Sequence, residues 1–270
     1  MVGFQDKVIL ITGSSLGIGK DLARLAGQQK ARIAINARNK ERLYAVRDEL
    51  NSAGFDVIAL AGDVSREEDC RSIIDSVISY FGRIDILINN AALSMRGRLE
   101  DLHLSVISTM YGVNVLGPVV LTRLALPHII RSKGSIVFIS SLAGMRGLPL
   151  VSVYSSAKMA LTAIAESLRI EHSKDGVHVG IVYVGYTEVK AGKVVLNNEG
   201  QSQTLEARTS VFVNSTEDVA NQIIRHIQKR RSKTIIGGIG KTYSLLNRLF
   251  PRLMDIVTAY SYQKFKKAYK

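Results

Sequence analysis

The feature that most constrains this chain is an apolar strand pattern that runs directly into a glycine-rich turn and then into a helix. Lys7–Thr12 has Val-Ile-Leu-Ile at its centre, as in strands that are buried on both faces. Gly13–Gly19 follows it, and a helical pattern begins at about residue 17. In this order, backbone N–H groups and the helix N-terminus can receive a phosphate group. The residues expected to contact such a ligand are Gly13, Ser15, Gly17, Ile18 and Gly19.

The same alternation of strand and helix patterns continues along the chain. Further strands are predicted at 32–36, 57–60, 84–88, 135–141, 177–183 and 233–236, and further helices at 40–52, 66–80, 105–131 and 216–230, with another through Tyr154. This order favours an α/β fold with a Rossmann-type, doubly wound, parallel seven-stranded sheet flanked by helices. We expect residues 1–240 to form this single domain and residues 241–270 to form a C-terminal helical extension. The polar stretch 190–214 is predicted to be a mobile lid.

Composition narrows the possible settings of the protein. With 270 residues, 46% of them hydrophobic, the chain can bury the core of one large domain. Its single cysteine, Cys70, excludes a disulfide framework and favours a reducing, cytoplasmic compartment. The five histidines are scattered, so no metal site is expected. The first strand leaves no room for a signal peptide, and no uncharged run reaches the length of about 20 residues that a spanning helix needs.

The positive charge lies mainly at the C-terminal end. The chain has a net charge of +13, yet residues 229–270 alone contain eleven Lys or Arg and one acid, Asp255. Aromatic residues are interspersed there, which raises the possibility of nucleic-acid binding. Because stacking platforms normally line a formed groove and this charge is confined to the tail, we expect no nucleic-acid partner.

The end of the second strand bears on the choice of cofactor. An acid at this place would hold the 2′-hydroxyl of NAD, whereas an arginine suits the 2′-phosphate of NADP. The chain has Ala37 and then Arg38, so NADP is the predicted cofactor, although a surface arginine would give the same pattern.

An unusual lysine lies on the helix that follows residue 151. Tyr154 and Lys158 fall on one helical stripe with Leu161, Ala165 and Leu168, which should face the core. Burial of an ammonium group costs free energy unless a polar or charged partner interacts with it. A neighbouring cation also lowers the pKa of a tyrosine hydroxyl. Bringing that pKa from about 10 to near 7 takes roughly 4 kcal/mol. Taken alone, the pair is more typical of a tyrosine and a snorkelling lysine at a helix rim.

Two further polar positions are candidates for the site, one within the long predicted helix and one at the end of a predicted strand. Pro118 has no N–H to donate, so the carbonyl of Asn114 could hold a water molecule, or the helix could simply bend there. Ser141 ends the fifth predicted strand, at the sheet edge where doubly wound folds bind ligands.

Together these positions resemble the short-chain dehydrogenase/reductase family over residues 7–237. The motifs are TGxxxGIG at Thr12–Gly19, Asn-Asn-Ala-Ala at 89–92, Asn114, Ser141 and YxxxK at Tyr154–Lys158. The resemblance implies that Tyr154 is the general acid or base, that Lys158 lowers its pKa and holds the nicotinamide ribose, and that Ser141 binds the substrate oxygen. It also implies that Asn114 anchors a relay water. The resemblance further implies that Asp63 and Val64 contact the adenine and that Asn90 lies along the cofactor.

Some features depart from the family pattern. Ala92 replaces a usual glycine, Val184-Gly185 replaces Pro-Gly, and Val189 stands where a threonine often contacts the nicotinamide amide, so the neighbouring Thr187 is the candidate contact. The long tail resembles the branch with 11β-hydroxysteroid dehydrogenase-like enzymes and 3-ketodihydrosphingosine reductase.

These resemblances imply an NADP(H)-dependent enzyme that interconverts a carbonyl and a secondary alcohol on an apolar, lipid- or steroid-like substrate, and that forms a homo-oligomer. The alternatives are a reductase of a small or acyl-carrier-bound ketone and a non-catalytic NADP-binding regulator.

The tail carries an amphipathic pattern of its own. From Pro251, a favourable first helical residue, apolar side chains recur at Leu253, Ile256, Val257 and Tyr260, followed by several lysines. Residues 243–270 are therefore expected to lie on a membrane surface, or else to pack on the body or on a second subunit.

Overall fold

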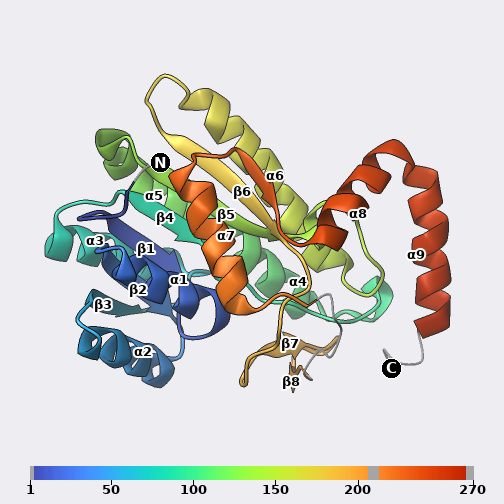
Figure 1. Ribbon diagram of the computed structural model, residues 1–270. Helices are drawn as coiled ribbons and strands as arrows, with labels where there is room; N and C mark the ends of the chain where they lie inside the picture. The colour runs from blue at the N-terminus through green and yellow to red at the C-terminus, as the bar shows by residue number, and fades with distance from the viewer. Residues whose placement is uncertain (1–2, 206–212, 266–270) are drawn as a thin grey trace.

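The computed structural model describes residues 3–205 and 213–265 and contains one large parallel sheet (Figure 1). Its strand order is β3-β2-β1-β4-β5-β6-β9, with every neighbouring pair parallel. The strands are β1 (Val8–Thr12), β2 (Arg32–Ala37), β3 (Asp56–Ala61), β4 (Ile86–Asn89), β5 (Ser135–Ser141), β6 (His178–Val184) and β9 (Lys233–Ile235). The predicted doubly wound, seven-stranded fold is thus confirmed. The order reverses between β1 and β4, which makes their carboxyl ends the ligand-binding crevice of such a sheet.

Helices cover both faces of the sheet. One face carries α1 (Gly17–Gln28), α2 (Lys40–Ser52) and α7 (Thr216–Gln228), and the other carries α3 (Glu67–Phe81), α5 (Gly117–Ser132) and α6 (Ser152–Glu171). The side chains of β1 alternate between the two cores, with Ile9 and Ile11 on the first face and Val8 and Leu10 on the second. This alternation explains why the strand is apolar throughout: both of its faces are buried.

The stretch after β6 contains a hairpin that the sequence pattern missed. Strands β7 (Val194–Leu196) and β8 (Ser202–Thr204) pair antiparallel within the segment expected to be a lid. Leu196 also pairs in parallel with Met95, so the hairpin is attached to the segment after β4. Residues 206–212 of the expected lid lie outside the described residues, and the lid's mobility stays a prediction.

The long predicted helix at 105–131 is present but not uniform. It consists of α4 (Leu104–Tyr111), a π-helical turn (Gly112–Leu116) and α5, so the chain widens before Pro118 and continues. By length and hydropathy, Leu104–Ser132 could cross a membrane. However, Val106, Met110 and Leu121 are buried in the protein, as expected for the core helix of a folded domain.

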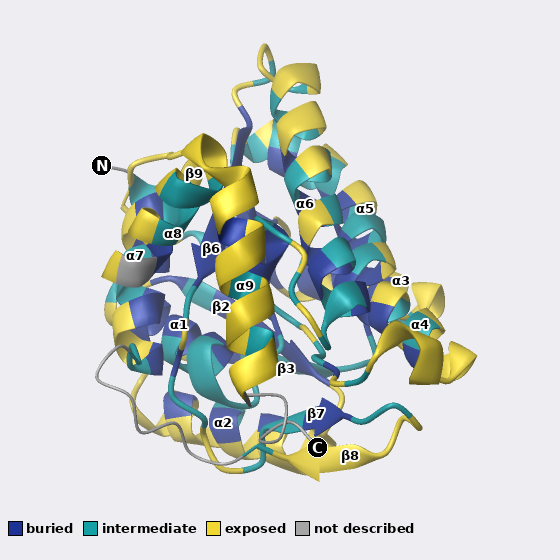
Figure 2. Ribbon diagram, turned by 90° about the vertical axis from the view of Figure 1, so that its right-hand side faces the viewer, coloured by how far each residue is buried: buried dark blue, intermediate teal, exposed yellow. Residues whose placement is uncertain are grey.

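The C-terminal extension forms two helices, α8 (Gly238–Leu249) and α9 (Pro251–Phe265). The helix predicted to begin at Pro251 is therefore present, while α8 begins shortly before the expected boundary at residue 240. Figure 2 shows α9 with most of its surface exposed.

Two buried histidines connect α7 to β6. His178 at the start of β6 lies near Ser135 Oγ and the Arg231 carbonyl, and the fully buried His226 lies 2.8 Å from Thr234 Oγ1. Their rings are 5.6 Å apart. Burial lowers the pKa of His178 to about 4, and burial together with the neighbouring His178 lowers the pKa of His226 to about 3.

This pair predicts a loss of stability in mild acid. Between about pH 6.5 and pH 4 these two histidines are protonated in the unfolded chain but stay neutral in the native state. The free energy of unfolding therefore falls as the pH falls. His226→Gln should remove part of this dependence, amounting to about 2 kcal/mol of the loss between pH 7 and pH 5. Urea denaturation at the two pH values, with the exposed His103→Gln variant as control, measures it. An unchanged pH dependence in His226→Gln would contradict the assignment.

Candidate active site

The glycine-rich turn after β1 is shaped by close backbone contacts. Gly13 and Gly17 have φ angles of +67° and +56°, which favour glycine. A Cβ on Gly13 would lie 2.8 Å from the Ala91 Cα atom, and one on Gly19 would lie 2.3 Å from the Gly13 carbonyl oxygen. Leu16 precedes α1 and has no side-chain acceptor, so the first N–H groups of the helix remain suited to an anionic ligand.

A hydrogen-bond network joins this turn to the end of β4. The Thr12 hydroxyl accepts hydrogen bonds from the backbone N–H groups of Asn90 and Ala91, at 3.0 and 2.9 Å. The Asn90 side-chain amide donates to the carbonyls of Thr12 and Gly13, at 2.8 and 3.1 Å. The hydroxyl of Ser14 is buried and donates to Ile11, whereas the neighbouring Ser15 is half-exposed. Asn90 therefore fixes the shape of the turn, and Ser15 offers its accessible hydroxyl.

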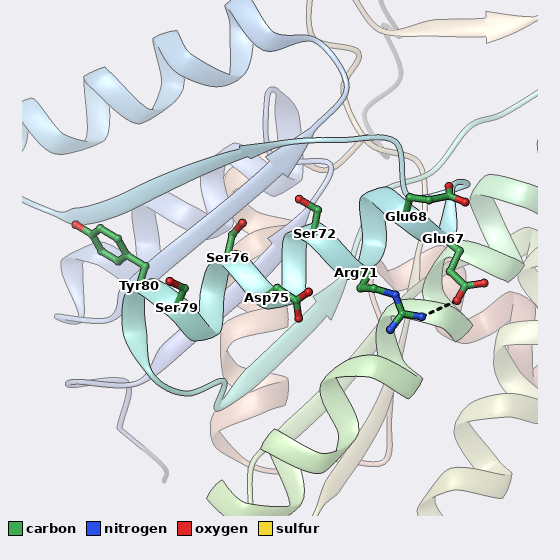
Figure 3. A pocket seen from close by; sticks show the side chains of 8 residues that line it. All are labelled: Glu67, Glu68, Arg71, Ser72, Asp75, Ser76, Ser79 and Tyr80. Carbon is green, nitrogen blue, oxygen red and sulfur yellow. Dashed lines mark hydrogen bonds and ion pairs between the residues drawn. The ribbon is translucent and has the colours of Figure 1, made fainter.

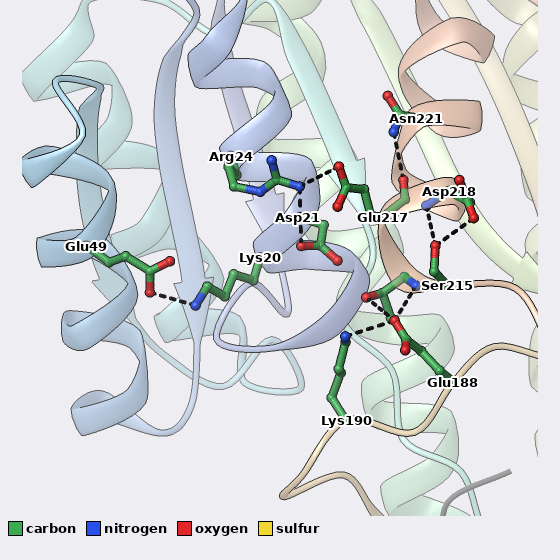
Figure 4. A network of polar contacts seen from close by, with 11 residues as sticks. Lys20, Asp21, Arg24, Glu49, Glu188, Lys190, Ser215, Glu217, Asp218 and Asn221 are labelled. Atoms are coloured by element: carbon green, nitrogen blue, oxygen red, sulfur yellow. Dashed lines mark hydrogen bonds and ion pairs between the residues drawn. The ribbon is translucent and has the colours of Figure 1, made fainter.

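Salt bridges brace the helices around the turn (Figure 4). Lys20 Nζ on α1 lies 2.6 Å from Glu49 Oε2 on α2, and Arg24 Nη2 on α1 lies 3.0 Å from Glu217 Oε1 at the start of α7. Glu188, in the loop after β6, accepts hydrogen bonds from the backbone and hydroxyl of Thr216. These contacts hold α1, α2, α7 and the loop after β6 around the crevice.

A charged pair lies at the outer end of the crevice. Arg38 Nη1 is 3.5 Å from Asp63 Oδ2, and the arginine side chain is 52% exposed. Partial burial raises the pKa of the Asp63 carboxyl, but hydrogen bonds from the backbone and hydroxyl of Ser65 and the Arg38 charge outweigh it, so its pKa lies below the ordinary value. Val64 follows Asp63 and is buried.

The side chain of Asn114 fixes the segment after β4. Asn114 is fully buried in the π-helical turn, where its amide donates to the Leu93 carbonyl at 3.0 Å and accepts from the Leu93 N–H at 3.2 Å. Leu93 directly follows Asn89–Ala92, so the turn positions that motif.

The two serines that end β5 have different surroundings. Ser140 is buried, and its hydroxyl donates to the Lys158 carbonyl at 3.0 Å. Ser141 is half-exposed, and its hydroxyl oxygen accepts from the Ala143 N–H at 3.2 Å, so its own proton can still be donated. Of the two, Ser141 is the hydroxyl that a ligand at the sheet edge can reach.

Tyr154 and Lys158 begin α6 beside this edge. Lys158 is only 3% exposed, so it does not snorkel to solvent. Its ammonium donates to the Ile139 carbonyl at 3.0 Å and lies 5.9 Å from the centroid of the Tyr154 ring. Burial lowers the pKa of this ammonium from 10.5 to about 8. The helix therefore places a buried, readily titrated lysine next to a half-buried tyrosine.

Apolar side chains form a wall next to Tyr154. A small cluster brings together the segment after β4, α4, α6 and the hairpin; its buried members are Met95, Leu102, Val106, Met110, Val153 and Leu196, with Tyr154 packed against them. A cavity of about 260 Å³ lies beside it and is lined by residues that include Arg38, Leu93, Thr109 and Leu196. Thr187, in the loop after β6, is buried, and its hydroxyl donates to the Gly185 carbonyl at 3.2 Å.

A larger groove lies elsewhere on the molecule. It follows the outer side of α3, where the lining residues are Glu67, Glu68, Arg71, Ser72, Asp75, Ser76, Ser79 and Tyr80 (Figure 3). None of the site residues described above lines it, and Arg71 pairs with Glu67 within it. It is the solvated face of a helix. Among the described residues, no cluster of His, Cys, Asp or Glu is arranged to hold a metal ion.

Comparison with known proteins identifies the family. Residues 7–200 match the family model described as short chain dehydrogenase. The chain belongs to the short-chain dehydrogenase/reductase family. This membership makes it an oxidoreductase of a family that uses small-molecule substrates and nicotinamide cofactors.

Individual relatives support the same assignment. The chain is 33% identical to 11-beta-hydroxysteroid dehydrogenase-like 2 of Arabidopsis thaliana, over 97% of this chain and 84% of that protein. The predicted branch of the family is thereby confirmed. An alcohol dehydrogenase from Thermococcus sibiricus, solved with 5-hydroxy-NADP, has a TM-score of 0.76 at 25% identity and covers 87% of this chain and 98% of its own. A short-chain dehydrogenase from Burkholderia phymatum, solved with NAD, has the same fold, with a TM-score of 0.81 at 21% identity over 94% of this chain and 97% of its own.

Sequence patterns missed some residues that shape the candidate site. The motif at Thr12–Gly19 includes Thr12 but not the role of its hydroxyl in organising the turn, and Leu196, which contributes to the apolar wall, was not expected. Arg146, in the loop after Ser141, contacts Asn247 and Asp255 of the tail. A leucine in a short strand or an arginine in a loop carries no distinguishing sequence signal, because these contacts join residues far apart in the chain.

Proposed function

We propose that this protein is an NADP(H)-dependent oxidoreductase that interconverts a carbonyl and a secondary alcohol on an apolar, lipid- or steroid-like substrate. The observation that carries the proposal is the buried Lys158 ammonium beside Tyr154, at the sheet edge where Ser141 ends β5. A buried cation of this kind is costly, and a role in proton transfer gives it a function.

The residues divide the chemistry as follows in the reductive direction. Ser141 donates a hydrogen bond to the substrate oxygen, and Tyr154 delivers the proton to that oxygen. Lys158 favours the tyrosine phenolate and, with a pKa of about 8, can resupply the proton. The Asn114 carbonyl, to which Pro118 cannot donate, holds a relay water behind the lysine. When bound, the nicotinamide cofactor supplies or accepts the hydride.

The cofactor would follow the crevice described above. Its pyrophosphate would lie at the N-terminus of α1 against Gly13–Gly19, with Ser15 and Ile18 beside it. Asp63 and Val64 would border the adenine, Lys158 would hold the nicotinamide ribose, and Thr187 is the proposed contact to the nicotinamide amide. The exposed Arg38 would turn from Asp63 to the 2′-phosphate of NADP.

Arg38→Ala tests the cofactor preference. The variant should lose about ten- to a hundredfold in kcat/KM with NADPH and little with NADH, because a charge-assisted hydrogen bond is worth roughly 1.5–3 kcal/mol. Arg47→Ala is the matched control, at a half-exposed arginine that pairs with Asp48 on α2. A wild-type enzyme that prefers NADH would contradict the assignment.

The apolar wall beside Tyr154 supports a hydrophobic substrate. Loss of NADPH absorbance with sterol, fatty and small carbonyl compounds tests this proposal. Turnover of small or acyl-carrier-bound ketones alone would favour the first alternative. Cofactor binding without turnover of any of them would favour the non-catalytic regulator.

The proposed setting is cytoplasmic lipid metabolism. We propose a homo-oligomer, either a dimer or a tetramer, in which residues 1–240 form the catalytic domain. Residues 241–270 form the extension, with its apolar and basic part, 243–270, at a membrane surface.

A further inference from the structure

The two tail helices expose seven large apolar side chains to solvent. These residues and their exposed fractions are Leu245 57%, Leu249 57%, Phe250 53%, Leu253 50%, Ile256 67%, Val257 47% and Tyr260 68%. We call these seven side chains the tail face. Large apolar side chains that gather on one exposed segment mark an interaction site.

The opposite side of the helices packs on the body and forms hydrogen bonds with it. Met254 is 7% exposed, and Asn247 Nδ2 donates to the Met145 carbonyl at 3.2 Å. Arg146 donates to Asn247 Oδ1, to the Pro251 carbonyl and to the Asp255 carboxylate. The apolar stripe of the tail therefore points away from the body. This excludes the predicted alternative in which the stripe packs on the body, since its residues Leu253, Ile256, Val257 and Tyr260 are exposed.

The charges around the tail face are positive. Lys241, Arg248, Arg252 and Lys264 are exposed on the same helices. Asp255 is the sole acid in the sequence from 238 to 265, and its carboxylate is paired with Arg146. The surface thus combines apolar side chains with an excess of basic over acidic residues on α8 and α9.

This charge pattern decides between two occupants. A symmetric dimer through the tail face would place the same cations opposite one another, which is unfavourable. An anionic bilayer instead accepts the apolar side chains at its headgroup boundary and attracts the cations. Arg248 and Arg252 also interrupt the apolar run, so the helices would lie on the membrane and not cross it.

We propose that the tail face binds anionic lipid membranes, with α8 and α9 lying in the headgroup region. The inference deepens and rests on the proposed function, because it places an enzyme for apolar substrates on the phase that dissolves them. Through Arg146 and Asn247, the bound helices are fastened to the loop that follows Ser141, so the membrane contact lies next to the substrate side of the site.

Vesicle co-sedimentation of the full chain tests the proposal. The Leu253→Gln/Ile256→Gln/Val257→Gln variant should bind vesicles of phosphatidylcholine with added phosphatidylserine at least tenfold more weakly than wild type. The control, Tyr80→Gln/Leu104→Gln/Ile170→Gln, removes apolar side chains that are also exposed, at 61%, 77% and 76%, on other helices, and should bind like wild type. Unchanged thermal unfolding of both variants shows that the fold is intact.

A charge variant separates the two parts of the interaction. Arg248→Gln/Arg252→Gln should bind the anionic vesicles several-fold more weakly than wild type. Binding of the wild-type protein should itself weaken in high salt, and on vesicles of phosphatidylcholine alone. Equal vesicle binding by wild type and the apolar variant would overturn the proposal. So would a change in oligomeric state without vesicle binding, which would assign the tail face to a second copy. NADPH oxidation with a water-soluble carbonyl should be equal in all variants, so failure of that reaction would count against the proposed function and not against the tail face.

Discussion

Replacing Tyr154 by phenylalanine should reduce turnover by 10²–10⁴-fold while leaving NADPH binding close to wild type. The hydroxyl is the proposed proton donor, and general acid–base groups contribute rate factors of about this size. The ring packs against the apolar cluster at Met95, Val106 and Val153, and phenylalanine preserves that packing. The measurement is kcat for carbonyl reduction together with the Kd for NADPH from fluorescence titration.

A second tyrosine gives a matched control for this result. Tyr111 on α4 also lies against α6, where its hydroxyl is 2.8 Å from Ser156 Oγ, and Tyr111→Phe removes the same atom. Its turnover should stay within about twofold of wild type. If Tyr154→Phe retained more than a tenth of the wild-type kcat, Tyr154 would not be the proton donor.

The sheet could be predicted from the sequence because its central strands, β1, β4, β5 and β6, are buried on both faces. Runs such as Val8–Leu10 and Ile136–Phe138 are apolar throughout, and the helices between them repeat their apolar side chains at helical spacing. The hairpin β7–β8 could not be recognised in the same way. Its strands have three residues each, and those of β8 are polar and exposed, so their pairing depends on contacts with Met95 and the segment around it.

In the candidate site, too, features that depend on local spacing could be predicted, whereas contacts between residues far apart in the chain could not. The burial of Lys158 followed from helical spacing with Leu161, which lies in the same core. By contrast, the contact between Arg38 and Asp63 joins the ends of two strands, and no local pattern at the end of the second strand shows that the arginine has an acidic neighbour. The outward orientation of the tail stripe was also open in the sequence, since the same spacing serves packing or exposure. The Arg146 contacts with Asn247 and Asp255 determine which side faces the body.

Lys158→Met should make the protein more stable and nearly inactive. Burial lowers the pKa of the ammonium from 10.5 to about 8, which corresponds to about 3 kcal/mol of unfavourable free energy for the charged form. Methionine has a similar shape and no charge, and the variant loses one hydrogen bond to the Ile139 carbonyl, worth about 1 kcal/mol. The free energy of unfolding at pH 7 without cofactor should therefore rise by about 2 kcal/mol, while kcat falls at least a hundredfold. Lys174→Met, at an exposed position just after α6, should change neither quantity.

The pH dependence of this gain separates charge burial from a general improvement in packing. The native pKa of Lys158 lies below that of the unfolded chain, so between about pH 8 and pH 10.5 the unfolded state binds more protons than the native state. The stability of the wild type therefore rises relative to Lys158→Met over that range, and the advantage of the variant disappears above it. Urea denaturation of both proteins at pH 7, 9 and 10.5 measures this difference. A gain that stays constant with pH would show that packing, not the buried charge, is responsible. A variant less stable than wild type at pH 7 would mean that the ammonium is stabilised by its surroundings, and the argument that its burial is retained for catalysis would lose its basis.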